Sequence, residues 1–147
     1  MAGMFVVNVE VAVHREGRWL MVERSAKEVH AAGALAMPGG TVEYEDADAG
    51  TLESCAHREV REEVGVTLHT DLRYVESKQF HSARGRQVIN VVFLAEHESG
   101  EAAVQDTDEA AWAGWLSLAD VLADDRAPVW LKASLTAAEQ THRGGNP

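Results

Sequence analysis

The feature that most constrains the fold is a change of hydrophobic period at Thr51. Before it, residues 4–13 ("MFVVNVEVAV") are rich in β-branched side chains and partly alternate apolar with polar, which predicts a strand. After it, Ala56, Val60 and Val64 recur every fourth residue, the spacing of one apolar helix face. A strong central helix between strand-like segments predicts an α/β protein with helices on the faces of a sheet.

The remaining segments give a consistent order of elements. A hairpin forms around the "HREG" turn, and Pro38-Gly39-Gly40 closes the loop that follows it. In chain order we expect strands over 4–13 and 18–24, a loop over 25–40, a strand over 41–44, a helix from the N-cap Thr51 to the stop at Gly65, strands over 66–77 and 85–100, a polar loop over 101–110, an extended segment over 110–118, a short helix capped by Ser117, a final helix from Pro128, and a tail over 142–147.

Composition narrows the class of protein. A chain of 147 residues with 46% apolar residues predicts one domain over 1–147 with its own core. The single cysteine, Cys55, excludes an internal disulfide and indicates a small core residue. No leader-like or bilayer-length apolar run is present, so we expect a cytoplasmic protein without a membrane partner. A net charge of −11 disfavours a nucleic acid polymer as partner.

The acidic charge is concentrated in one place. Residues 43–65 hold eight carboxylates against Arg58 and Arg61. On a helical wheel, Glu59, Glu62 and Glu63 fall within an arc of roughly 100° beside the apolar stripe. Like charges at this spacing repel by a few tenths of a kcal/mol, and three carboxylates near a core suit a hard divalent cation. A solvated charged face, neutralised by the two arginines, is the alternative.

Two other metal sites can be tested by counting. An EF-hand loop needs acids at positions 1, 3 and 5, glycine at 6 and glutamate at 12; starting at Asp46 puts Gly50 at position 5 and His57 at position 12. The spacing therefore fails. The seven histidines are scattered and Cys55 has no partner at ligand spacing, so the sequence gives no support to a zinc site.

The segment "REVREEVGV" over 58–66 resembles the second half of the Nudix (MutT-like) hydrolase box. "PGG" at 38–40 followed by "TVE", the hairpin before it, "VVFLAE" after it and "WLSL" at 115–118 are also similar to the family, so the resemblance covers most of the chain. It implies a Nudix-type α/β/α sandwich with a central mixed β-sheet. The front of the box differs: eleven residues instead of seven separate Asp46 from Arg58, which leaves the first acidic position open among Glu45, Asp46 and none.

The resemblance implies roles for particular residues. Glu62 and Glu63 would ligate Mg²⁺, or Mn²⁺ as a substitute, with help from a backbone carbonyl of Gly39 or Gly40. Glu59 would be a further ligand or the base on the attacking water. Arg58 would hold a glutamate by a charge-assisted pair. The reaction would be metal-assisted hydrolysis of a diphosphate linkage.

Substrate contacts are expected outside the box. Glu109 is the first candidate for an additional acid and Glu96 the second. The segment 78–87 between two strands, together with the end of the second strand, offers groups for phosphate or base: Arg24, Lys78, Phe80, His81, Arg84 and Arg86. Trp112, Trp115 and Trp130 are assigned to the core or an interface rather than to base stacking.

These observations predict a pyrophosphohydrolase of nucleoside diphosphates linked to another moiety, such as a nucleoside triphosphate, ADP-ribose, a nucleotide sugar or a dinucleoside polyphosphate. A catalytically weak module that binds a nucleotide or a protein is the alternative, because the front of the box is altered. The intact acids Glu59, Glu62 and Glu63 favour the enzyme. Domains of this kind commonly dimerise, so a homodimer is a further expectation.

Overall fold

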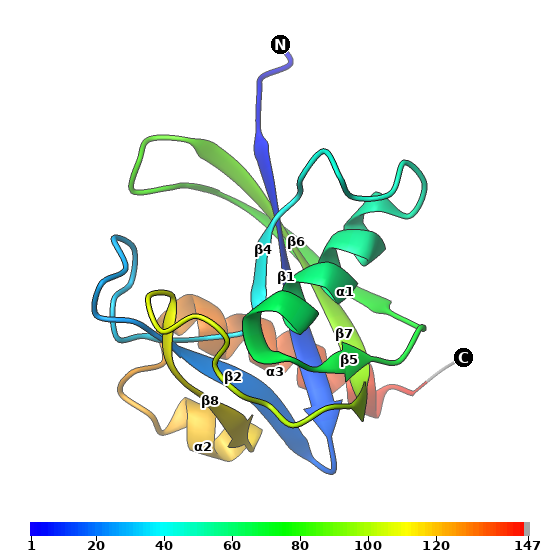
Figure 1. The fold of residues 1–147 in the computed structure, drawn as a ribbon, viewed down its shortest axis with the longest axis vertical. Coiled ribbons are helices and arrows are strands. Elements are labelled where there is room, and N and C mark those ends of the chain that lie inside the picture. The colour runs from blue at the N-terminus through cyan, green and yellow to red at the C-terminus, as the bar shows by residue number, and fades with distance from the viewer. Residues whose placement is uncertain (146–147) are drawn as a thin grey trace.

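A mixed β-sheet forms the centre of the computed structural model, which describes residues 1–145 (Figure 1). Strand β1 pairs in parallel with β7 and antiparallel with β2 and β4, and every other pairing is antiparallel. The strands are β1 (Val6–Arg15), β2 (Arg18–Arg24), β3 (Leu35–Ala36), β4 (Gly39–Thr41), β5 (Thr67–Leu68), β6 (Arg73–His81), β7 (Gln87–Ser99) and β8 (Ala110–Leu116).

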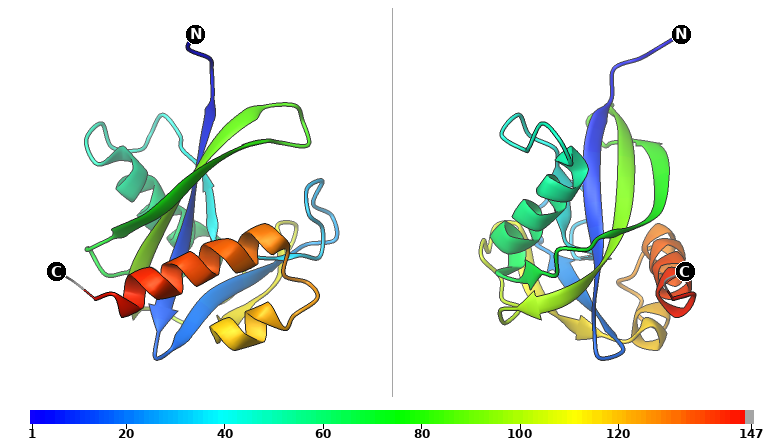
Figure 2. Two further views of the ribbon diagram at one scale, coloured as in Figure 1. Left: turned by 180° about the vertical axis from the view of Figure 1, so that it is seen from behind. Right: turned by 90° about the vertical axis from the view of Figure 1, so that its right-hand side faces the viewer.

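Helices cover both faces of this sheet. Helix α1 (Thr51–Val64) lies on one face, and α2 (Leu118–Leu122) and α3 (Val129–Arg143) lie on the other, as the edge-on view in Figure 2 shows. The predicted α/β/α sandwich with a mixed sheet is confirmed. Among the described residues, no helix combines the length and apolar character needed to cross a bilayer.

Successive side chains of β1 point to opposite faces of the sheet and contribute to two separate cores. Val9, Val11 and Val13 point toward α1 and pack on the predicted stripe of Ala56, Val60 and Val64. Ala12 points the other way, into a core formed with α3. Burying this apolar surface on both faces stabilises the sandwich by roughly 25 cal/mol per Å². Asn8, Glu10 and His14 share the α3 side of β1 with Ala12, because successive side chains alternate between faces.

Several predicted boundaries are confirmed. β1 and β2 form the hairpin around residues 16–17, and Gly65 ends α1 in the left-handed region with φ 71°. Ser117 caps α2 through a capping box with Asp120. Pro128 is the N-cap of α3.

Other boundaries were wrong. Thr51 is the first residue of α1 rather than its cap; Gly50 is the N-cap, and the Thr51 hydroxyl donates to the Ala47 carbonyl at 2.6 Å. The strand expected at 41–44 is β4, which begins earlier, at Gly39, and ends at Thr41, opposite Asn8 of β1.

Further differences concern loops and termini. The loop over 25–40 contains strand β3, the strand over 66–77 divides into β5 and β6, and β6 continues through Lys78–His81, which the sequence assigned to a loop. The predicted tail over 142–147 is shorter, because α3 includes residues 142 and 143; residues 146–147 lie outside the described part of the chain.

The tryptophans also differ from expectation. Trp19 is the fully buried one, whereas Trp112 is 37% exposed and Trp130 is 55% exposed. Trp115 is half-buried against the core on the α1 side. Trp130 therefore lies outside the core, on the surface of α3, and its alternative assignment to an interface stays a prediction.

Candidate active site

The two glycines of β4 bring the chain against the acidic end of α1. A Cβ on Gly40 would overlap the Glu59 carboxylate, and a Cβ on Gly39 would overlap the backbone carbonyl of Val9. Only glycine allows both contacts at once. The Gly39–Gly40 segment therefore lies in direct contact with the carboxylate-bearing side of α1.

Glu63 is tied directly to this segment. The Gly39 N–H donates to Glu63 Oε2 at 3.0 Å. Removal from water raises the pKa of Glu63 to about 7, with the nearby Glu59 and Glu109 carboxylates adding to the effect. A cation placed among these acids would lower the same pKa, since it stabilises the ionised carboxylates.

Arg58 holds the acids in position, and Asp46 holds Arg58. The guanidinium donates from Nε to Asp46 Oδ1 at 2.8 Å and from Nη2 to Oδ2 at 3.0 Å, a two-point pair. Its Nη1 donates to Glu59 Oε1 at 2.8 Å and to Glu62 Oε2 at 3.2 Å. The Arg58 hydrogen bonds, aided by the Glu43 N–H, lower the pKa of Asp46 to about 2.

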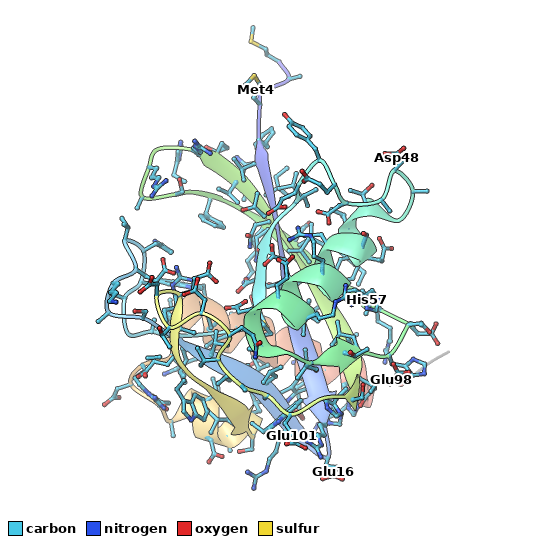
Figure 3. The ribbon with its side chains drawn as sticks, viewed as in Figure 1. Met4, Glu16, Asp48, His57, Glu98 and Glu101 are labelled. Carbon is cyan, nitrogen blue, oxygen red and sulfur yellow. The ribbon has the colours of Figure 1, made fainter. Side chains whose placement is uncertain are left out.

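Of the two acids considered for the first acidic position, Asp46 is the one that contacts Arg58. The Asp46 side chain is almost fully buried, whereas Glu45 is exposed. The additional residues of the loop extend outward, with Asp48 at its tip (Figure 3). The chain therefore returns to place Asp46 beside Arg58 despite the altered spacing.

The predicted metal ligands share one side of a helix, although their carboxylate oxygens are not gathered within 4.8 Å of one another in the described residues. Glu59, Glu62 and Glu63 lie along the same side of α1, facing Gly40, Arg58 and Gly39 respectively. Burial raises the pKa of Glu59, and Arg58 opposes that rise. Glu62 keeps 61% of its side chain exposed and is free to turn toward a ligand.

A cavity of about 780 Å³ lies on the α3 side of the sheet, beside the β4 segment. All six groups that the sequence offered for phosphate or base line it: Arg24, Lys78, Phe80, His81, Arg84 and Arg86. Phe80 on β6 and Trp130 on α3 are both exposed, at 40% and 55%, and offer aromatic faces to a ligand.

Arg24 connects the cavity with the acidic end of α1. Its positive charge lowers the pKa of Glu63 and Glu109, and also that of Glu10 in the cavity, although burial raises the net pKa of all three. The guanidinium is held by the His30 carbonyl at 2.8 Å from Nε and by Glu28 at 3.4 Å from Nη2. Arg24 is thus a cation that faces both parts of the site.

Glu109 lies on the acidic side rather than in the cavity. Its carbonyl accepts the Ser25 N–H at 3.0 Å, which fixes the loop before β8 beside Arg24. Glu96, the second candidate, is not in this site; it lies six residues beyond Asn90 on β7 and contacts two histidines.

Comparison with known proteins places this arrangement in a family. The sequence profile described as the NUDIX domain matches residues 4–137. The chain belongs to the Nudix hydrolase family. Members of this MutT-like family are pyrophosphohydrolases, enzymes that act on acid anhydrides.

Two individual relatives show how far the likeness extends. NAD-capped RNA hydrolase NudC of Chromobacterium violaceum is 35% identical over 104 residues, which cover 71% of this chain. The matched part is 35% of NudC, so the chain spans about a third of that relative. A MutT NUDIX hydrolase from Burkholderia pseudomallei is 26% identical with a TM-score of 0.77, over 92% of this chain and 98% of that one.

A third structure shares the Nudix fold at lower identity. The NUDIX domain of Shewanella oneidensis NrtR, crystallised with ADP ribose, has a TM-score of 0.73 and 20% identity, over 99% of this chain and 91% of that one. At this identity the likeness concerns the fold alone.

The Nudix cavity has a polar floor that the sequence did not reveal. Asn8 Nδ2 donates to Asn90 Oδ1 at 2.7 Å, and Asn90 Nδ2 donates to Glu10 Oε1 at 2.6 Å. Burial raises the pKa of Glu10. Polar residues at alternate positions of a strand are the available signal, but the parallel pairing of β1 with β7 is needed to join them.

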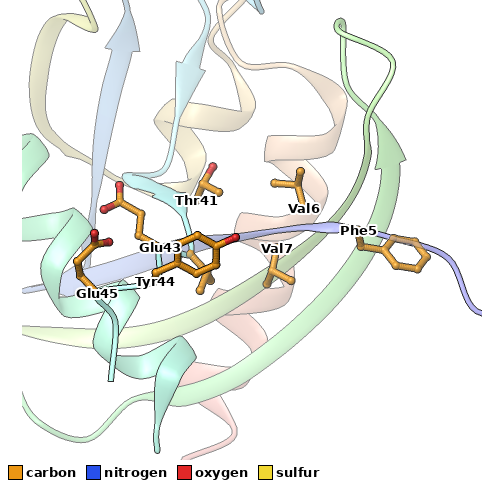
Figure 4. Close-up of a pocket in the computed structure, with 8 residues that line it drawn as sticks. Phe5, Val6, Val7, Thr41, Glu43, Tyr44 and Glu45 are labelled. Carbon is orange, nitrogen blue, oxygen red and sulfur yellow. The ribbon is translucent and has the colours of Figure 1, made fainter. Parts of the chain in front are cut away.

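A second, shallower hollow of about 590 Å³ lies at the start of β1, lined by Phe5–Val7 and residues 41–45 (Figure 4). Glu43 and Glu45 are its charged side chains, and Tyr44 is fully exposed beside it. It contains none of the α1 acids that define the Nudix site.

Proposed function

We propose that this Nudix protein is a Mg²⁺-dependent hydrolase that cleaves the diphosphate linkage of a nucleoside diphosphate joined to another moiety. One observation carries the proposal: Glu63 and Glu59 lie against Gly39 and Gly40, and Arg58, fixed by Asp46, joins Glu59 to Glu62. Arg24 links these acids to the cavity, because it lines the cavity and its charge lowers the pKa of Glu63.

The donor set fits a hard divalent cation. Mg²⁺ is held by a few carboxylates and completes its octahedron with water and substrate phosphate. Glu59, Glu62 and Glu63 would hold it, with the carbonyl of Gly39 or Gly40, and Mn²⁺ would substitute because it accepts the same oxygen ligands. When bound, the metal would neutralise diphosphate oxygens and activate water for attack on phosphorus.

The protein groups supply position and proton transfer. Arg58 orients Glu59 and Glu62 through its two Nη1 hydrogen bonds. Glu59, poised against Gly40, is our candidate for the base on the attacking water, an assignment favoured by a buried carboxyl with a raised pKa. Glu109 is a candidate for an additional acid on the same side.

The cavity would receive the rest of the substrate. Arg24, Arg84 and Arg86 carry positive charge for phosphate oxygens in an otherwise anionic protein. Phe80 and Trp130 would stack on the base, and the Asn8–Asn90–Glu10 chain would hydrogen-bond its edge. The neighbour crystallised with ADP ribose supports a nucleotide-type ligand for this fold.

A substrate panel tests the proposal. Nucleoside triphosphates, ADP-ribose, nucleotide sugars and dinucleoside polyphosphates are incubated with Mg²⁺ or Mn²⁺, and products are identified by mass spectrometry. We expect hydrolysis at a diphosphate linkage, lost on chelation and reduced about a hundredfold or more in a Glu62→Gln/Glu63→Gln double variant. Full activity in that variant would refute the assigned site.

A binding module without turnover remains the competing function. The longer loop before α1 favours it, whereas the intact Asp46–Arg58 pair favours catalysis. Calorimetry on the same panel separates the two, since a module would bind a nucleotide that the protein leaves intact. The expected homodimer is a separate prediction, tested by analytical ultracentrifugation.

A further inference from the structure

A second group of metal-ligating side chains lies away from the Nudix site. His14 on β1, Glu96 on β7 and His142 on α3 place one ligand atom each within 4.8 Å of one another. His14 is paired with Glu96 across the parallel strands, and α3 brings His142 over both. His14 lies four residues beyond Glu10 on β1, about 13 Å at roughly 3.3 Å per residue.

The two imidazole nitrogens converge on the Glu96 carboxylate. His14 Nδ1 lies 3.0 Å from Glu96 Oε1, and His142 Nε2 lies 3.2 Å from the same oxygen. The two imidazole rings stand 3.8 Å apart, tilted by 33°. Both rings therefore present a nitrogen to one point rather than to solvent.

Neighbouring groups fix the orientation of the rings. The buried Trp19 meets His14 edge-on at 5.0 Å and His142 at 6.0 Å. Trp19 is itself held, because its Nε1–H donates to Glu139 at 3.0 Å and Arg143 donates to the other oxygen of Glu139 at 2.8 Å. The His14 side chain is 12% exposed and that of His142 is 34% exposed, so the His14 ring is the more firmly held of the two.

We propose that His14, Glu96 and His142 form a second metal site, selective for Zn²⁺ or a similar borderline divalent ion. Two imidazoles and one carboxylate are a common ligand set for Zn²⁺, with water completing the tetrahedron. The α1 acids offer only oxygen and suit Mg²⁺, so the two sites differ in the ion that they select. The Zn²⁺ site would fasten the C-terminal end of α3 to the sheet.

Binding requires both histidines to change tautomer. His14 Nδ1 and His142 Nε2 each face the Glu96 carboxylate, which accepts, so each ring carries its proton on the nitrogen that would bind the metal. The Gly17 N–H donates to His14 Nε2 at 3.2 Å, which places the His14 proton on Nδ1, facing Glu96. Zn²⁺ takes the Nδ1 lone pair, so the neutral ring carries its proton on Nε2 instead. The Gly17 N–H must then turn to solvent, which is feasible because it lies in the exposed turn that also carries Glu16 (Figure 3).

Calorimetric titration of Zn²⁺ into protein saturated with Mg²⁺ tests the proposal. We expect one Zn²⁺ per chain, and affinity about tenfold or more lower in Glu96→Gln and His142→Gln variants. Glu98→Gln, on the same strand, and His57→Gln, on α1, are matched controls that should keep wild-type affinity. The site should also persist in the Glu62→Gln/Glu63→Gln double variant, which separates it from the proposed active site.

Side-chain ¹⁵N NMR gives a readout independent of activity. We expect the His14 proton on Nδ1 without Zn²⁺ and on Nε2 with it. Absence of Zn²⁺ binding, equal affinity in all variants, or an unchanged His14 tautomer at saturation would each overturn the proposal. The cluster would then be a hydrogen-bonded tie between α3 and the sheet.

Discussion

Asp46 is the residue that preserves the active-site geometry in spite of the altered loop. Its carboxylate accepts two hydrogen bonds from Arg58, which in turn directs Glu59 and Glu62. A carboxylate that neutralises a buried guanidinium is costly to remove, since the partner charge is left unpaired. Asp46 is therefore a positioning residue that acts through Arg58.

Replacing Asp46 should lower turnover without abolishing metal binding. In Asp46→Asn we expect a loss of about 1–3 kcal/mol in the Arg58 contacts, and kcat lower by about tenfold or more. Glu45→Gln is the control, because Glu45 is exposed and should leave kcat unchanged. Steady-state kinetics on both variants decides, and equal losses would contradict the assignment of Asp46.

The two glycines of β4 should respond differently to alanine. In Gly40→Ala the new methyl meets a side-chain carboxylate, which can move, so activity should fall while the fold persists. In Gly39→Ala it meets the Val9 backbone, which cannot yield cheaply, so unfolding should occur at lower urea concentration. Gly3→Ala, whose Cβ has only a contact at 3.8 Å, is the control. Equal urea midpoints for Gly39→Ala and Gly3→Ala would show that the backbone contact is not limiting.

Glu63 should make the stability of the metal-free protein depend on pH. Its pKa of about 7 exceeds the ordinary 4.5, so the folded state binds the proton more tightly than the unfolded state. This contribution is complete below pH about 4.5 and is lost as pH rises through about 7, on the order of 3 kcal/mol. In EDTA, urea titrations of Glu63→Gln should lack this component, leaving Glu63→Gln more stable than wild type above pH 7. A wild-type profile that matches the variant would contradict the assignment of this pH dependence to Glu63.

At the level of elements, the β6–β7 hairpin forms one wall of the cavity. Phe80, Arg84 and Arg86 of this hairpin line the cavity. The parallel β1–β7 pair forms the floor of the cavity. In the proposed function, the hairpin would bind substrate and the α1 acids would hold the metal. Binding and chemistry would then reside on different elements.

Removing the hairpin arginines should affect substrate binding more than chemistry. Arg84→Ala and Arg86→Ala should each raise KM about tenfold at nearly constant kcat, because each would remove a proposed substrate contact in the cavity rather than a group at the metal-bound linkage. Arg18→Ala, at the exposed start of β2 and outside the cavity, should behave as wild type. A fall in kcat alone would contradict this division of roles.

Sequence periodicity predicted the features that depend on residues close together in the chain. Ala56, Val60 and Val64 identify the buried face of α1 by spacing alone, and the box identifies its acids. Features that depend on distant partners were missed. Asp46 meets Arg58 only through the path of the loop, and His14 meets residues 82 and 128 positions away only through the parallel strand pair and α3.

At the scale of the whole molecule, two cores share a single sheet. The α1 side and the α3 side are separated by one layer of strands, whose alternate residues belong to one core or the other. Displacing either helix would expose the apolar side chains of the shared strands. The molecule should therefore unfold as a unit.

Shortening a buried side chain on α3 should test whether the molecule unfolds cooperatively. Leu135 is fully buried on α3, and Leu135→Ala should reduce the free energy of unfolding by about 2–5 kcal/mol. Leu122→Ala, at a 43% exposed position of α2, should cost much less. Urea titrations followed by circular dichroism and tryptophan fluorescence should give coincident single transitions; separate midpoints would show that the two layers unfold independently.

The parallel pairing of β1 with β7 also bears on synthesis by the ribosome. Asn8 cannot form its hydrogen bond until Asn90, 82 residues later in the chain, has been synthesised. β4 and α1 are translated before then. The hairpin of β1 and β2 can close early, but the central edge of β1 stays open until β7 has emerged. Such a nascent chain exposes an apolar strand edge for most of its elongation, so its folding is late, slow and dependent on protection from aggregation.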